Sequence, residues 1–167
     1  ILSEYEVALI GIAICEALSY LHTRRPPIIH RDIKPGNIKI TPEGEIALVD
    51  FGLAKVFLEH EATTTGARAM TPGYSPPEQY GTAPTDERSD VYSLGATLYA
   101  ALTGAIPEDA LARATGKARL TGIRQLQPHI DRKLASAIEK AMEVDPEDRY
   151  QTAAEFRQAL AEAANIH

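Results

Sequence analysis

The chain has 167 residues, of which 44% are apolar, 24% charged and 6% aromatic, and 17 Lys and Arg against 23 Asp and Glu make a net charge of −6. A chain of this length and apolar content buries a large core, which excludes disorder as its main state. The acidic balance argues against nucleic acid as a partner. No apolar run approaches the roughly 18 residues of a membrane span. The single cysteine, Cys15, excludes an internal disulfide, so we expect a reducing, cytoplasmic location and no membrane contact by this segment.

The first half of the chain predicts one long helix followed by a short β-ribbon. Residues 3–6 read Ser-Glu-Tyr-Glu, a capping-box pattern, and apolar residues then recur at steps of three and four. A helix is therefore expected over 4–22. Two consecutive prolines at 26–27 prevent it from continuing. The β-branched runs 38–40 and 46–49 are separated by Thr-Pro-Glu-Gly-Glu, which favours a hairpin turn.

The second half predicts a long loop and then several helices. Residues from about 58 to 80 are rich in Thr, Gly, Pro and Ala, and long ordered loops in compact domains are usually functional. Apolar residues between 91 and 102 share one helical face, and the helix is expected to end at Gly104. Further helices are expected at 109–114, around 134–142 and from a second capping box at 152–155. The predicted fold class is mainly α with a small β-ribbon.

Five short motifs follow one another along the chain. His-Arg-Asp-Ile-Lys-Pro-Gly-Asn occupies 30–37, before the ribbon, and Asp-Phe-Gly occupies 50–52, after it. The other three are Thr-Pro-Gly-Tyr-Ser-Pro-Pro-Glu at 71–78, Ser-Asp-Val-Tyr-Ser-Leu-Gly at 89–95 and Asp-Pro-Glu-Asp-Arg at 145–149. In sequence and order they resemble eukaryotic-like Ser/Thr protein kinases of the bacterial type. The resemblance implies a protein kinase-like fold and covers its C-terminal, large lobe without the N-terminal lobe. Residues 1–167 would form one partial kinase domain, with a catalytic loop at 30–37 and an activation segment at 50–78.

The residue types in these motifs also suit phosphate transfer on chemical grounds. The reaction needs an acceptor hydroxyl held in line, hard oxygen ligands for magnesium and positive charge beside the moving phosphate. Asp32 can accept or orient the hydroxyl proton, and Lys34 can place an ammonium beside the γ-phosphate of ATP. Asn37 and Asp50 offer oxygens of the kind that Mg²⁺ prefers. Lys39 stands where the family usually has an apolar residue beneath the adenine ring, and its methylenes can cover that ring.

The resemblance also indicates the acceptor. The spacing of Asp32 and Lys34 is that of kinases acting on Ser or Thr, and Thr71 matches the threonine that hydrogen-bonds both of these residues in that branch. We therefore expect protein substrates with Ser or Thr acceptors. Thr63, Thr64 and Thr65 lie in the activation segment, where a phosphate could pair with Arg31 and order the loop. A plain polar loop is the alternative interpretation of these threonines.

The remaining matched residues imply structural support. Glu78 and Arg149 match a buried ion pair, and Asp90 matches the carboxylate that holds the backbone of the catalytic loop. His30 and Phe51 match apolar supports of the site, and Gly52 removes a side chain where the backbone turns. The supporting set is therefore His30, Arg31, Phe51, Gly52, Glu78, Asp90 and Arg149.

Several parts of a complete kinase have no counterpart in this sequence. No segment resembles the glycine-rich phosphate loop, the strand lysine that pairs the α- and β-phosphates, or the hinge that reads adenine. These parts are expected before Ile1, where the chain begins without Met, and would form an N-terminal lobe in cis. We expect the 167 residues alone to have no appreciable kinase activity. The alternatives are a non-catalytic, pseudokinase-like scaffold lobe and a small-molecule phosphotransferase of the aminoglycoside-kinase type.

Overall fold

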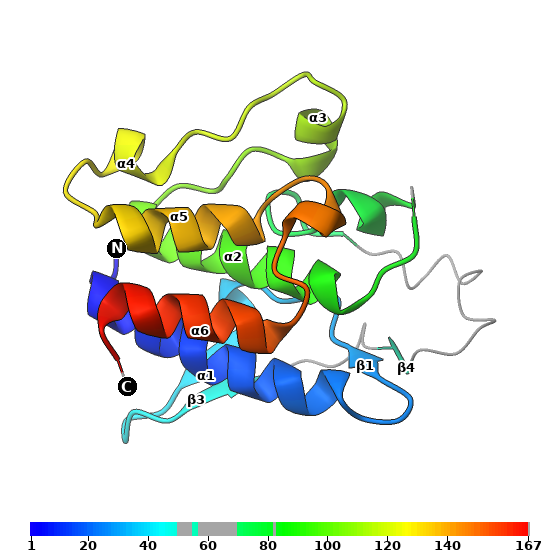
Figure 1. The fold of residues 1–167 in the computed structure, drawn as a ribbon, viewed down its shortest axis with the longest axis horizontal. Helices are drawn as coiled ribbons and strands as arrows, with labels where there is room; N and C mark the ends of the chain where they lie inside the picture. Colours follow the sequence, from blue (N-terminus) through cyan, green and yellow to red (C-terminus); the bar gives the residue numbers. More distant parts are fainter. Residues whose placement is uncertain (50–54, 57–69, 82, 167) are drawn as a thin grey trace.

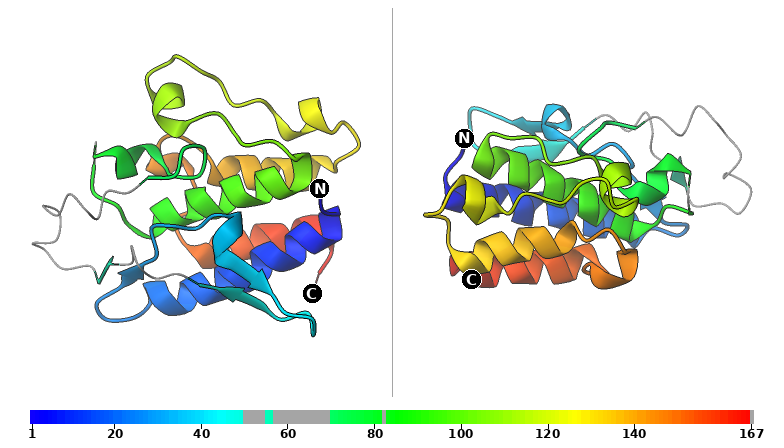
Figure 2. Two further views of the ribbon diagram at one scale, coloured as in Figure 1. Left: turned by 180° about the vertical axis from the view of Figure 1, so that it is seen from behind. Right: turned by 90° about the horizontal axis from the view of Figure 1, so that it is seen from above.

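The computed structural model describes residues 1–49, 55–56, 70–81 and 83–166 (Figure 1). Four helices form its core: α1 (Glu4–His22), α2 (Glu87–Thr103), α5 (Arg132–Ala141) and α6 (Ala153–Ala164). Helix α1 packs against α2 and α6, and α5 packs against the same two helices. Figure 2 shows this bundle from behind and from above. Most residues of α2 are buried, as expected of a helix that is surrounded by others.

The ends of the helices follow the predicted signals with one exception. Ser3 and Glu6 form the predicted reciprocal capping box at the start of α1. Helix α2 ends at Thr103, and Gly104 follows in the left-handed conformation at φ 74°. The predicted second box is only half formed. The Thr152 side chain accepts from the Glu155 amide, but the Glu155 carboxylate accepts from the Gln151 amide instead of that of Thr152.

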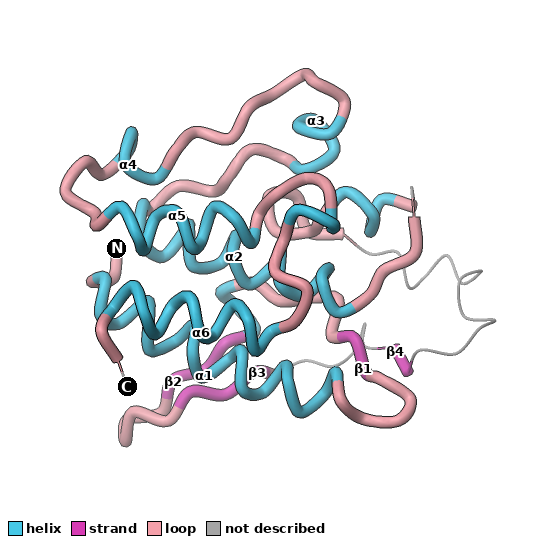
Figure 3. Tube along the Cα trace, viewed as in Figure 1, coloured by secondary structure: helices cyan, strands magenta, loops and turns pink. Residues whose placement is uncertain are grey.

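The strands form two small antiparallel pairs (Figure 3). Strands β2 (Ile38–Ile40) and β3 (Ile46–Leu48) make the predicted ribbon, with Lys39 opposite Ala47, and the hairpin closes through the Gly44 amide and the Thr41 carbonyl. Strand β3 ends one residue earlier than predicted. Strand β1 (Ile28–Ile29) pairs with β4 (Lys55–Val56), a pairing that was not predicted because two-residue strands carry no readable period.

Short helical turns connect the larger elements. They are η1 (Pro35–Asn37), η4 (Pro77–Tyr80), α3 (Ala110–Ala114), α4 (Ile123–Leu126) and η5 (Pro146–Asp148). Helix α3 begins after its N-cap Asp109 and confirms the predicted short helix. Helix α4 was not predicted, since four residues are too few to show a 3.6-residue period.

Helix α1 corrects one expectation drawn from composition. It has 19 residues with a mean hydropathy of 1.3, which is long and apolar enough to cross a membrane by length and composition alone. In the structure 44% of this stretch is buried inside the protein, where Val7, Ile14 and Leu18 belong to the core. A core helix of a folded domain passes the same test, so the feature is weak evidence for a membrane span.

Candidate active site

The catalytic loop predicted at 30–37 leaves β1 and ends in η1, and Asp32 lies at its centre. The Asn37 side-chain amide donates to the Asp32 carbonyl at 2.7 Å and to its Oδ2 at 3.1 Å. The Lys34 Nζ lies 3.7 Å from the same Oδ2. The Asp32 side chain is only 12% exposed, whereas that of Lys34 is 35% exposed. A carboxylate that is only partly exposed and has an ammonium beside it can receive a proton from a bound hydroxyl.

His30 ties the catalytic loop to the end of the ribbon. Its ring is fully buried, its Nδ1 accepts from the Asp32 amide at 3.1 Å, and its Nε2 donates to the Val49 carbonyl at 2.9 Å. Both bonds together fit an imidazole that carries its proton on Nε2. The Val49 amide in turn donates to the Asn37 carbonyl at 2.8 Å. His30 therefore orients Asp32 and fixes the residue that precedes Asp50.

Asp90, in the first turn of α2, binds the backbone of the catalytic loop. Its fully buried carboxylate accepts from the backbone amides of His30 at 2.8 Å and Arg31 at 3.0 Å. A third donor was missed in the sequence: the Nε2 of His22 donates to the same carboxylate at 2.8 Å. His22 ends α1, 68 residues before Asp90. The contact could not be predicted from the sequence around His22, because it depends on the packing of α1 against α2.

Replacing His22 by Ala is expected to lower the free energy of unfolding by about 1–3 kcal/mol, because the buried Asp90 carboxylate loses one of its donors. Urea unfolding of the chain measures this loss. The matched control is His129→Ala, at an exposed histidine, which should change stability by less than about 0.5 kcal/mol. Equal effects of the two substitutions would contradict a role of His22 in holding Asp90.

Arg31 has a left-handed backbone at φ 71°, which is unusual for a residue other than glycine. Its amide donates to Asp90, and its carbonyl accepts from the Nε2 of Gln79 at 2.7 Å. Such a conformation costs of order 1–3 kcal/mol and persists where surrounding contacts impose it. Gln79, in η4, is a second supporting residue that the sequence did not reveal. It connects the catalytic loop to the end of the predicted activation segment.

Thr71 approaches Asp32 from the other side. Its Oγ1 donates to the Asp32 Oδ1 over 3.4 Å, a long hydrogen bond, and its amide donates to the Ser75 hydroxyl at 2.8 Å. The expected bond from Thr71 to Lys34 is absent from the described part of the structure. Gly73 follows at φ 91°, and a Cβ there would lie 2.4 Å from the Cγ2 of Ile106. Only glycine suits this position. The residues around Gly73 therefore pack closely against Ile106 in the loop after α2.

Glu78 and Arg149 form the buried ion pair that the resemblance implied, and the structure shows it to be bidentate. The two N···O distances are 2.6 and 3.0 Å, and the side chains are 4% and 0% exposed. The Ser89 hydroxyl also donates to Glu78 at 2.8 Å. Arg149 makes its remaining hydrogen bonds to the carbonyls of Arg88, Glu143 and Val144. The pair therefore joins η4 to the segment before α6.

The predicted site residues Asp50, Phe51, Gly52, Thr63, Thr64 and Thr65 lie outside the described residues. Lys39 is exposed in β2. The described residues contain no group of three or more His, Cys, Asp or Glu side chains able to hold a metal. Asn37 does fit a magnesium ligand, because its amide nitrogen is taken up by Asp32 and its side-chain oxygen is a hard donor.

Comparison with known proteins identifies the family. The family model described as "Protein kinase domain" matches residues 1–162. The chain belongs to the protein kinase domain family. It is 40% identical over 158 residues to a probable serine/threonine-protein kinase of Clostridium perfringens, covering 91% of this chain and 23% of that protein. It is 39% identical to the serine/threonine-protein kinase PknB of Mycolicibacterium smegmatis, covering 87% of this chain and 24% of that protein. The kinase chain thus spans about a quarter of the length of these relatives.

Solved structures support the same conclusion about the fold. The kinase domain of Mycobacterium tuberculosis PknI is similar with a TM-score of 0.73 and 29% identity, covering 98% of this chain and 57% of that one. The predicted fold class is confirmed: a mainly α, protein kinase-like large lobe with a small β-ribbon.

Proposed function

We propose that this lobe belongs to a Ser/Thr protein kinase that transfers the γ-phosphate of ATP to Ser or Thr hydroxyls of protein substrates. One observation carries the proposal: the Asp32 carboxylate is held by Asn37 and approached by Thr71 while Lys34 stands beside it. These residues lie as far apart as 39 positions in sequence. A scaffold lobe would not need a carboxylate and an ammonium arranged in this way.

Each residue then has a role in the transfer. Asp32 orients the acceptor hydroxyl and takes its proton, and Lys34 neutralises charge on the transferred phosphate. Asn37, together with Asp50, would hold the magnesium ion. That ion would supply Lewis-acid neutralisation of the phosphate oxygens. Lys39 would lie along the adenine ring, and Thr71 would help position Asp32 against the substrate.

The rest of the proposal concerns the whole protein. An N-terminal lobe in cis would close the ATP site, and phosphorylation among Thr63, Thr64 and Thr65 would order the activation segment through Arg31. A cytoplasmic location suits an ATP-dependent enzyme in signalling.

Cys15 is not expected to act as a reactive thiol, because burial raises the pKa of its thiol well above the usual range.

The test compares the 167-residue chain with the whole protein that contains it. Each is given magnesium and ATP labelled in the γ-phosphate, together with paired peptides that differ only in a Ser, Thr or Tyr acceptor. We expect label on Ser and Thr but not Tyr with the whole protein, and no appreciable transfer by the chain alone. Transfer to an aminoglycoside instead of the peptides would favour the small-molecule alternative. Absence of any transfer by the whole protein would favour the scaffold.

A further inference from the structure

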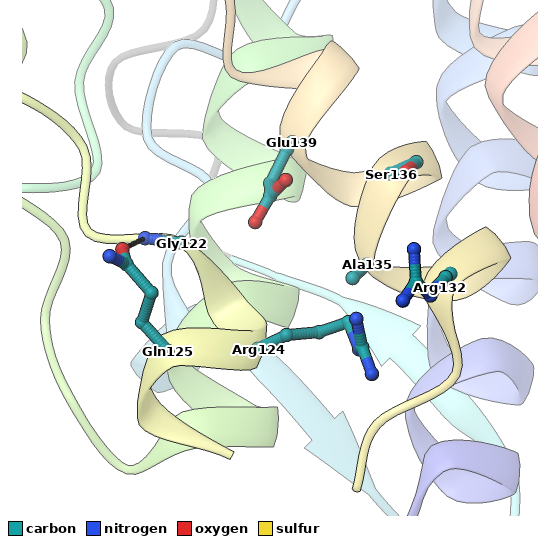
Figure 4. A pocket seen from close by; sticks show the side chains of 7 residues that line it. All are labelled: Gly122, Arg124, Gln125, Arg132, Ala135, Ser136 and Glu139. Atoms are coloured by element: carbon teal, nitrogen blue, oxygen red, sulfur yellow. Dashed lines mark hydrogen bonds between the residues drawn. The ribbon is translucent and has the colours of Figure 1, made fainter. Parts of the chain in front are cut away.

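A pocket of about 290 Å³ lies between α4 and the first turns of α5, away from the catalytic loop (Figure 4). Arg124 reaches across it from α4, and Arg132 and Ser136 border it on α5. The volume is at the small end for ligand pockets, which suits one side chain better than a whole nucleotide. Two guanidinium groups and a hydroxyl at one site are donors that match a phosphate group.

The two arginines differ in how far their hydrogen bonds are used. Arg124 donates to the carbonyls of Ile130 at 2.9 Å and Pro128 at 3.3 Å, which fixes its side chain. The Arg132 side chain is exposed and makes no hydrogen bond or ion pair with any residue that the structure describes. The Glu139 carboxylate lies seven residues further along α5, about two turns away. It accepts from the Ile123 amide at 2.7 Å. Two guanidinium groups therefore line the pocket, one held by backbone carbonyls and one without a partner among the described residues. Glu139, the one carboxylate among the lining residues that the structure describes, accepts from the Ile123 amide at the border of the pocket and keeps its negative charge there.

Part of the pocket lining belongs to a basic segment of the chain. Residues 117–133 contain five Lys or Arg and one Asp, a net charge of +4, while the whole chain carries −6 and the remainder therefore −10. Residues 24–40, around the catalytic loop, carry the same net charge of +4, and basic segments of an acidic protein attract anionic groups. Arg124 and Arg132 are the two cations of segment 117–133 that line the recess, so a single projecting anionic side chain fits better than a broad anionic surface.

We propose that this pocket binds a phosphorylated Ser or Thr side chain of a protein segment. The inference rests on the proposed function in one respect: a Ser/Thr kinase produces this group on its partners or on itself. A phosphate carries a charge of about −2 and three acceptor oxygens, enough to engage both Arg124 and Arg132. The pocket would hold a phosphorylated partner to the large lobe while the catalytic loop stays free.

The experiment is an NMR titration of the isotope-labelled chain without ATP. The probes are an acetylated, amidated Ala-Ala-phosphothreonine-Ala-Ala peptide and its unphosphorylated twin. We expect the phosphopeptide alone to shift resonances of Gly122, Arg124 and Ser136. Arg132→Ala should weaken its binding by about tenfold or more, since charge-assisted hydrogen bonds are lost. Lys133→Ala removes the same charge from the adjacent residue, which does not line the pocket, and should change binding less than about twofold.

Three results would overturn the proposal. These are no shift at the pocket up to about 10 mM phosphopeptide, equal shifts with both peptides, or equal weakening by the two substitutions. Vesicles containing phosphatidylserine form a further arm, and shifts caused by them but not by the phosphopeptide would assign the pocket to membranes. Phosphate transfer by the whole protein is measured separately, so a failed titration leaves the proposed function intact and the converse also holds.

Discussion

Asp32→Asn is expected to lower kcat for phosphate transfer to a Ser/Thr peptide by about 10²- to 10⁴-fold, the range for losing a positioned general base. Asparagine keeps the size of the side chain and can still bond to Asn37 or Thr71, but it neither takes a proton nor pairs with Lys34. KM for ATP should change little, because Asp32 addresses the acceptor hydroxyl. Steady-state kinetics of the whole protein measure both constants.

The matched control is Asp148→Asn, the same chemical change at an exposed aspartate in η5. It should leave kcat within about twofold of the parent. Unfolding curves of both variants establish that the effect belongs to the chemistry and not to the fold. If Asp32→Asn keeps more than a tenth of the parent kcat, Asp32 is not the residue that accepts or orients the proton.

Glu78→Ala is expected to cost about 3–5 kcal/mol of unfolding free energy, because it leaves the fully buried Arg149 guanidinium without its carboxylate. Such a loss is a large share of a typical domain's stability. Glu78→Gln therefore accompanies it, since the amide keeps an oxygen for Arg149 and Ser89 and should cost less than Glu78→Ala. The midpoint and slope of urea unfolding give both values.

Glu147 provides the matched control for Glu78. It pairs with Arg88 at 2.6 Å, the same distance as the shorter contact between Glu78 and Arg149, but its side chain is 76% exposed. Glu147→Ala should cost less than about 1 kcal/mol, because exposed charges are screened by water. Comparable losses of unfolding free energy from Glu78→Ala and Glu147→Ala would show that burial does not determine how much the Glu78–Arg149 pair contributes to stability.

Much of the fold could be predicted because its signals are local. The capping box at Ser3, the stop at Gly104 and the hairpin between β2 and β3 each depend on residues a few positions apart. The errors concern features that local patterns cannot describe. The Glu155 carboxylate accepts from the Gln151 amide instead of that of Thr152. Strand β1 pairs with β4 through Ile28–Val56 and Ile29–Lys55, on the far side of the ribbon in sequence.

The candidate site divides in the same way. The motif residues Asp32, Lys34 and Asn37 are recognisable in the sequence, since their chemistry and spacing lie within one loop. Their supports were only partly recognisable. His22 and Gln79 hold the loop through contacts spanning 68 and 48 residues, and neither belongs to a pattern that marks it.

The sequence by itself determined the family resemblance, the helical class, the acidic balance and the residue types that phosphate transfer requires. The tertiary structure decided how these residues meet: Thr71 beside Asp32, Asp90 beneath the loop, and Arg124 and Arg132 around one pocket. The physical reason is that a residue's type and near neighbours set its local conformation. Hydrogen bonds and ion pairs between distant segments form only once packing of the core brings those segments within about 3 Å.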